Sequence, residues 1–194
     1  MPRRAGACYN GLMRFRKGPW TVLESRVVYK NPWMEVREDK VITPGGKDGR
    51  YGSMKLKSGV SIIALDAKKN VYLTKEYHYG IGKTTLEAVS GGQEKGHSPL
   101  QTAKRELLEE AGLKARKWTP LGRADALTTY LAAPMRLYLA EDLAQHEQEL
   151  EEVEVIEVVK MPLKKALKLI DDGTITHAAT IIALLKVAIL KKLI

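Results

Sequence analysis

The stretch GGQEKGHSPLQTAKRELLEEAGL, residues 91–113, joins a glycine-rich loop to a helix whose two ends are both marked in the sequence. Ser98 is a good N-cap, Pro99 suits the first helical position, and Gln101 completes a capping box. Gly112 suits the left-handed conformation in which many helices end. The sequence therefore predicts a helix that begins at Pro99 and ends just before Gly112.

This helix concentrates negative charge on one flank. Its apolar stripe, which we expect to face the core, consists of Leu100, Ala103, Leu107 and Ala111. Glu106, Glu109 and Glu110 are expected on the opposite side, where like charges at these spacings cost about 0.2–0.5 kcal/mol per pair. A solvated helix face is one interpretation, because acidic runs of this kind are common on protein surfaces.

The glycine-rich loop favours a metal site instead. Gly91, Gly92 and Gly96 allow the backbone to pass close to a ligand and to turn sharply onto the helix. A divalent cation would convert the repelling carboxylates into a binding site. Clustered oxygen ligands without His or Cys suit Mg²⁺ (or Mn²⁺) rather than zinc.

The same residues resemble the signature of the Nudix hydrolases, which is Gly, five residues, Glu, seven residues, then Arg-Glu-apolar-x-Glu-Glu-x-Gly-apolar. Here the pattern runs from Gly91 through Arg105 to Leu113, and eight of its nine defined positions are kept. The exception is His97, which stands where the family has glutamate. The resemblance implies an α/β/α sandwich around a mixed sheet and hydrolysis of a nucleoside diphosphate linked to another moiety.

The resemblance also implies roles for individual residues. By position, Glu106 and Glu110 look like the main metal ligands, with Glu109 close behind. Arg105 looks like the residue that orients a glutamate by ion pairing, and the carbonyl of Ser90 stands where such enzymes often supply a backbone oxygen to a metal.

The departure at position 97 lies outside this ligand set. The family glutamate there usually tunes the site without being its central ligand. A loop histidine is most often simply exposed, and weaker metal binding is the alternative. Because Glu106, Glu109 and Glu110 are all present, we expect activity to survive.

A wider resemblance connects residues 20–190 with the ADP-ribose pyrophosphatase group. Glu87 matches the Glu of that group's Glu-x-Pro-Ala-Gly pattern, and His78 replaces an Arg that often contacts substrate. Both are therefore candidates for substrate binding. Residues 124–134 lack the usual Ser-Pro-Gly pattern, so another nucleoside diphosphate sugar, or a different nucleotide, is a possible substrate.

These enzymes often carry a water-activating glutamate in an acidic loop before a late strand. The corresponding segment here is HEQELEEVEVIEVV, residues 146–159. Glu154 and Glu152 are its best candidates for the general base or for an additional metal ligand. A solvated loop residue is the alternative interpretation for each.

The rest of the sequence contains both strand and helix patterns, which predicts a fold of the α/β class. Strands are predicted over residues 20–29, 33–42, 51–57, 60–66, 71–77, 135–141 and 153–161. The run 60–66 is expected to be buried on both faces, and further helices are predicted over 162–173 and 176–192. Residues 1–18 lack periodicity, which predicts a loose arm.

The first strands predict a small antiparallel β domain. Together with the arm it would occupy residues 1–57, leaving residues 58–194 as the catalytic domain. In the related group this extra domain commonly swaps across a homodimer, so the resemblance implies a homodimer formed through residues 1–57.

The amino-acid composition limits the cellular compartment and the partners that we expect for this protein. The single cysteine, Cys8, excludes an internal disulfide and a Cys-based zinc site, and it fits a reducing cytoplasm. No secretory signal is evident, and the longest apolar run is interrupted by Lys186, so no membrane association is expected. The net charge of +9 is spread along the chain, which makes nucleic acid an unlikely partner.

The leading hypothesis is thus Mg²⁺-dependent hydrolysis of ADP-ribose or a similar nucleotide sugar, a small-molecule substrate. A hydrolase acting on another nucleotide or on RNA 5′ ends is one alternative, suggested by the charge. A non-catalytic binding module of the same fold is another, and only His97 and the altered substrate segments favour it.

Overall fold

The computed structural model describes residues 8–9, 12–150, 152 and 155–194. Backbone contacts divide the chain into two compact units. The N-terminal unit runs to Lys57 and includes residues 127–133, and the C-terminal unit comprises residues 58–126 and 134–194. The sequence predicts that residues 127–133 belong to the catalytic domain, residues 58–194. They belong to the N-terminal unit because Leu131 and Ala132 pair in parallel with Met54 and Lys55.

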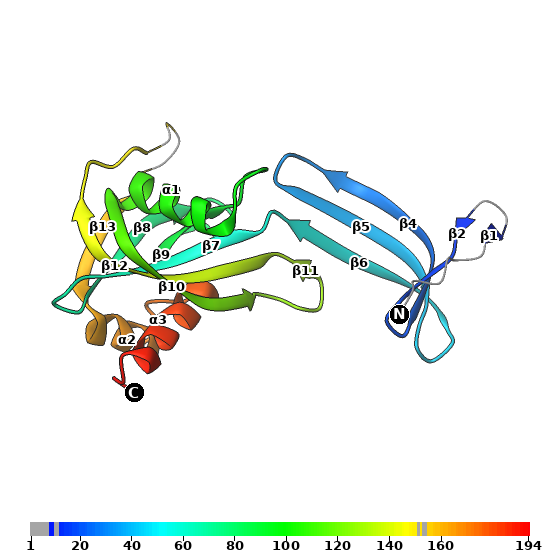
Figure 1. Ribbon diagram of the computed structural model, residues 1–194. Coiled ribbons are helices and arrows are strands. Elements are labelled where there is room, and N and C mark those ends of the chain that lie inside the picture. Colours follow the sequence, from blue (N-terminus) through cyan, green and yellow to red (C-terminus); the bar gives the residue numbers. More distant parts are fainter. Residues whose placement is uncertain (1–7, 10–11, 151, 153–154) are drawn as a thin grey trace. The chain divides into compact units, whose positions relative to one another are not determined.

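The N-terminal unit consists of β-structure (Figure 1). A five-stranded sheet has the order β11-β6-β5-β4-β3, and a separate pair is formed by β1 and β2. The strands are β1 (Cys8–Tyr9), β2 (Leu12–Met13), β3 (Phe15–Lys17), β4 (Trp20–Lys30), β5 (Met34–Ile42), β6 (Asp48–Leu56) and β11 (Leu131–Ala132). All pairs except β11–β6 are antiparallel, in agreement with the predicted antiparallel sheet.

The prediction of a loose arm over residues 1–18 was wrong for its described strands. Phe15–Lys17 forms β3, which pairs with β4, and β1 pairs with β2. Gly18 has φ +61°, which allows a tight turn that sets Lys17 opposite Trp20. The pairing was missed because three residues are too few to show a periodicity.

The C-terminal unit is a mixed six-stranded sheet with helices on both faces (Figure 1). The strand order is β10-β12-β7-β9-β8-β13, with β7 and β12 parallel and the other neighbours antiparallel. The strands are β7 (Gly59–Leu65), β8 (Asn70–His78), β9 (Lys83–Gly92), β10 (Leu113–Asp125), β12 (Pro134–Gln145) and β13 (Glu157–Pro162), and the helices are α1 (Pro99–Ala111), α2 (Leu163–Asp171) and α3 (Ala178–Leu190).

Two apolar clusters fill the spaces between this sheet and its helices. On one face, Ala103 and Leu107 of α1 pack against Val60 and Ile62. On the other face, α2 and α3 pack through a cluster that includes Leu163. Strand β7 contributes to both clusters and is buried along its whole length, as predicted. None of the helices in the described residues is long and apolar enough to cross a membrane.

Two long strands, β9 and β10, were not predicted. β10 lies at the edge of the sheet, where Pro120 is tolerated because one side of the strand has no partner. The pairing of β10 with β12 shifts register between Pro120 and Gly122, and Gly122 has φ +102°. A proline and a bulge in mid-strand break the alternation on which a strand prediction depends.

Both ends of α1 form as the sequence predicts. Ser98 Oγ accepts a hydrogen bond from Gln101 N at 3.2 Å, and Gln101 Oε1 accepts one from Ser98 N at 2.8 Å. At the other end Gly112 has φ +60°, and its N–H donates to the carbonyl of Leu108 at 2.8 Å. The helix therefore begins and ends at fixed residues.

The chain after β12 is attached to the end of α1. His146 N donates to the Gly112 carbonyl at 2.7 Å, and Glu149 N donates to the Glu109 carbonyl at 3.0 Å. The Gln148 side chain donates to the Glu110 carbonyl at 2.6 Å. These bonds satisfy carbonyls that a helix end leaves without partners. They also hold the start of the acidic segment at the end of the helix that carries Glu109 and Glu110.

Alanine at Gly112 is expected to destabilise the protein more than alanine at Gly173. Both glycines have positive φ, so both variants carry a backbone strain of about 1–2 kcal/mol. A Cβ at Gly112 would also lie 2.6 Å from the His146 carbonyl oxygen, whereas nothing lies within 4 Å of one at Gly173. We expect a further loss of about 1–3 kcal/mol for Gly112→Ala in urea unfolding. Equal losses would contradict this contact.

Candidate active site

The helix glutamates are less exposed than the sequence suggested. Glu106 and Glu110 are each 7% exposed, whereas the side chain of Glu109 is 24% exposed. The expectation that all three lie opposite the apolar stripe was therefore wrong for Glu106 and Glu110. Their positions fall about 100° and 60° around the helix from Leu107, which places them at the border of the stripe, where β9 covers them.

Backbone atoms of β9 form the surface against which these carboxylates lie. A Cβ built on Gly91 would overlap the Glu106 carboxyl group, so this position accommodates only glycine without a shift. Ser90 N donates to Glu110 Oε2 at 3.3 Å. Ser90, whose carbonyl is a candidate metal ligand, thus lies directly beside the buried carboxylates.

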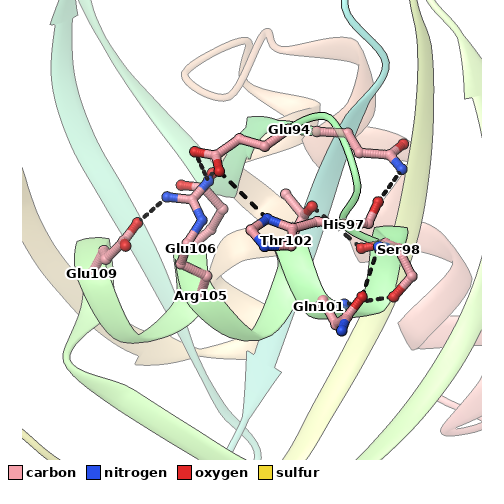
Figure 2. A network of polar contacts seen from close by, with 9 residues as sticks. Glu94, His97, Ser98, Gln101, Thr102, Arg105, Glu106 and Glu109 are labelled. Carbon is pink, nitrogen blue, oxygen red and sulfur yellow. Dashed lines mark hydrogen bonds and ion pairs between the residues drawn. The ribbon is translucent and has the colours of Figure 1, made fainter.

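Arg105 joins the acidic groups of the helix and the loop. Its guanidinium is ion-paired with Glu109, lies 2.5 Å from Glu106 Oε1 and lies 3.6 Å from Glu94 Oε1 (Figure 2). Burial of the guanidinium lowers its pKa, but the carboxylates of Glu106, Glu109 and Glu94 outweigh burial and raise the Arg105 pKa above its ordinary value. Arg105 therefore remains charged beside these carboxylates.

The chemistry of these groups fits a hard divalent cation. Three carboxylates lie within one turn of α1, beside a strand that has no side chain at Gly91. Among the residues that the structure describes, no three Asp, Glu, His or Cys side chains are already arranged around a metal position. Because Arg105 engages Glu106 and Glu109, a bound cation would have to compete with its guanidinium for these oxygens.

The structure brings the two candidate substrate residues together. His78 Nε2 lies 3.2 Å from Glu87 Oε1, within ion-pair distance but not aligned for a hydrogen bond. Glu87 also accepts from Thr85 Oγ1 at 2.6 Å and lies 2.9 Å from His177 Nδ1. Burial raises the Glu87 pKa, but the contacts with His177 and Thr85 outweigh burial and lower it. Glu87 is thus an ionised group held by protein partners, and His78 is the more accessible of the two.

Sequence reasoning missed two members of these networks, Glu94 and His177. His177 is the residue before α3, and its ring also contacts Thr180 Oγ1 at 2.9 Å. Its connection to Glu87 crosses from the start of α3 to β9, so no local pattern indicates it. Glu94 lies in the loop before α1, where the family signature defines no residue.

The two candidates for a general base lie in the acidic segment after β12. Glu152 is exposed in a turn, and Glu154 lies outside the described residues. The preceding residues are bound to the end of α1, as described above. Both candidates therefore remain predictions.

Alanine at Gly91 is expected to impair the site, whereas alanine at Gly92 is a matched control. The added Cβ would displace the Glu106 carboxyl group in the first variant, while nothing lies within 4 Å of a Cβ at Gly92. We expect Gly91→Ala to weaken Mn²⁺ binding by about 10–100-fold, the range found when the supports of metal ligands are lost. Titration of free Mn²⁺ by EPR measures the affinity, and similar affinities in both variants would rule out this role for Gly91.

Comparisons with known proteins cover both units. Residues 55–184 match the model of the NUDIX domain, and residues 20–54 match the model described as the nucleoside diphosphate sugar hydrolase N-terminal domain. A crystal structure of ADP compounds hydrolase is similar to the chain with a TM-score of 0.78 and 25% sequence identity, covering 89% of this chain and 94% of that one. The predicted fold, with its additional N-terminal sheet, is confirmed by these matches.

Two curated relatives carry different names. The chain is 28% identical over 159 residues to the ADP-ribose pyrophosphatase of Bacillus subtilis (strain 168), which covers 81% of this chain and 86% of that protein. It is 24% identical over 163 residues to the methanol dehydrogenase activator of Bacillus methanolicus, which covers 83% and 88% respectively.

Proposed function

Because the chain belongs to the Nudix family of hydrolases, we propose that it hydrolyses the pyrophosphate bond of ADP-ribose or a related nucleoside diphosphate sugar. The products would be a nucleoside monophosphate and a sugar phosphate. The observation that carries this proposal is the set of carboxylates Glu106, Glu109 and Glu110 against the open backbone of Gly91. The similarity to the Bacillus subtilis ADP-ribose pyrophosphatase supports the choice of substrate.

The chemistry requires charge neutralisation more than a covalent nucleophile. A pyrophosphate carries dense negative charge that repels an attacking oxygen. A bound Mg²⁺ supplies neutralisation of the phosphate oxygens and activates or positions water. Glu106, Glu110 and Glu109 would hold this ion, with the Ser90 carbonyl as a backbone ligand. Arg105 places its positive charge beside Glu106 and Glu109.

Removal of a proton from water is assigned to the acidic segment after β12. We propose Glu154 or Glu152 as the general base. The support is the attachment of residues 145–149 to the end of α1, which brings the chain to the helix that carries the metal ligands. His78 and Glu87 are proposed as substrate contacts, because His78 Nε2 lies 3.2 Å from Glu87 Oε1 and Glu87 is held by His177.

Substitution of Glu110 tests the metal site. We expect Glu110→Gln to lower kcat by at least about 100-fold. Substituting a residue that only hydrogen-bonds to a metal ligand already lowers activity by about 10–100-fold. Glu157→Gln is the matched control, because Glu157 is an exposed glutamate of β13 that pairs with Lys75 at 3.0 Å. Steady-state rates at saturating Mg²⁺ measure the effect. Comparable activity in the two variants would refute the assignment.

A substrate panel at constant Mg²⁺, with products identified by mass, tests the reaction itself. The expected result is 5′-AMP and ribose 5-phosphate from ADP-ribose. A strong preference for nucleoside triphosphates or capped RNA would overturn the substrate class. Binding of nucleotides without any turnover would identify a non-catalytic module and overturn the enzyme proposal.

We further propose that the protein is a homodimer formed through the N-terminal unit. Its sheet exposes large apolar side chains, namely Val27, Val28, Tyr29 and Trp33. Large apolar side chains that are exposed in this way are candidates for burial at an association surface. The match to the nucleoside diphosphate sugar hydrolase N-terminal domain covers this segment.

The dimer is tested by placing a charge on this surface. Sedimentation velocity is expected to give the mass of a dimer for the unmodified chain and of a monomer for Val28→Glu, because burying an unpaired carboxylate is costly. Val155→Glu is the control, since Val155 is 84% exposed and belongs to the C-terminal unit. A monomeric parent, or a Val28→Glu variant that stays dimeric, would exclude this interface.

A further inference from the structure

We propose that Glu94 is a positioning residue of the metal site, and that it supplies the loop carboxylate absent at position 97. The proposal rests on the proposed function, because it concerns the same carboxylates of α1. It is carried by the geometry of the loop before α1, where Glu94 contacts both His97 and Arg105 (Figure 2).

The Glu94 carboxylate uses its two oxygens in different directions. Oε2 lies 3.4 Å from His97 Nδ1, and Oε1 lies 3.6 Å from the guanidinium of Arg105. His97 carries no negative charge, so it cannot form an ion pair with Arg105. Among the described loop residues 93–97, Glu94 thus supplies the carboxylate that contacts Arg105, and His97 lies on the other side of Glu94.

The loop that carries Glu94 is held by several hydrogen bonds. Gln93 N donates to the Ser58 carbonyl at 2.7 Å, and the Gln93 side chain donates to the His97 carbonyl at 2.6 Å. His97 N donates to the Glu94 carbonyl at 3.3 Å, and Gly96 has φ +91°, which closes the turn. The backbone at Glu94 is therefore fixed relative to β7 and to the start of α1.

The position of Glu94 affects how strongly Arg105 binds the helix glutamates. Arg105 shares its charge among three carboxylates, and only Glu94 belongs to the loop rather than to α1. Without the Glu94 charge, Arg105 would interact more strongly with Glu106 and Glu109. The local electrostatic potential would also become less negative. Both effects make it harder for a cation to bind, because the cation competes with the guanidinium for the same oxygens.

The test measures Mn²⁺ binding to the full chain without substrate, using the EPR signal of free Mn²⁺ as the readout. Glu94→Gln is expected to weaken Mn²⁺ binding by about 10-fold. This is the lower end of the range found when a residue that contacts the metal ligands is lost. Glu157→Gln is expected to bind Mn²⁺ as the parent does. The double variant Glu94→Gln/His97→Glu should regain the parent's affinity, because it restores a negative charge to the loop before α1.

Activity and stability measurements separate positioning from folding. Glu94→Gln should raise the KM for Mg²⁺ while kcat recovers at saturating Mg²⁺, and its thermal unfolding without metal should match that of the parent. A purely structural role would lower thermal stability and leave the double variant unrescued, which would overturn the proposal.

Failure of this inference is distinguishable from failure of the proposed function. If the parent and Glu94→Gln bind Mn²⁺ equally well, Glu94 has no positioning role and the metal site stands. If the parent itself binds no Mn²⁺, the metal-dependent function falls, and this inference falls with it.

Discussion

The structure depends on how three carboxylates are kept close together on one helix. Glu106 and Glu110 are almost fully covered, which normally raises the free energy of an ionised group. The Arg105 guanidinium offsets this cost at Glu106, and the backbone N–H of Ser90 offsets it at Glu110. The absence of a side chain at Gly91 leaves the space that the Glu106 carboxylate fills. Helix α1 and strand β9 are therefore one functional element, although a loop separates them in the sequence.

The framework around this element restricts α1 at both ends. The capping box at Ser98 fixes where the helix starts, and Gly112 fixes where it ends. At Gly112 the chain after β12 approaches so closely that a Cβ would meet the His146 carbonyl. The same approach supplies hydrogen-bond donors to the last carbonyls of the helix and delivers the acidic segment. Gly112 thus ends the helix and leaves room for the backbone that begins the acidic segment.

Local signals in the sequence predicted the parts of the fold that are decided locally. The ends of α1 followed from Ser98, Gln101 and Gly112, and the burial of β7 followed from its apolar run. β10 was missed because its edge position tolerates Pro120 and a bulge. The burial of Glu106 and Glu110 was missed because it depends on β9, which covers the helix from elsewhere in the chain. The contacts of His177 with Glu87 and of Glu94 with Arg105 were missed for the same reason.

This division between local and distant determinants explains why the reaction class is easier to infer than the substrate. The proposed metal ligands of α1 lie within about one turn of a single helix, so a short motif contains them. The groups that would select a nucleotide come from separate segments, such as His78 on β8 beside Glu87 on β9 and His177 before α3. Substitutions in these segments would change the candidate substrate contacts without altering the sequence of α1. Relatives with the names ADP-ribose pyrophosphatase and methanol dehydrogenase activator match this chain over similar lengths. A carboxylate helix combined with independently varying segments would allow such differences within one fold.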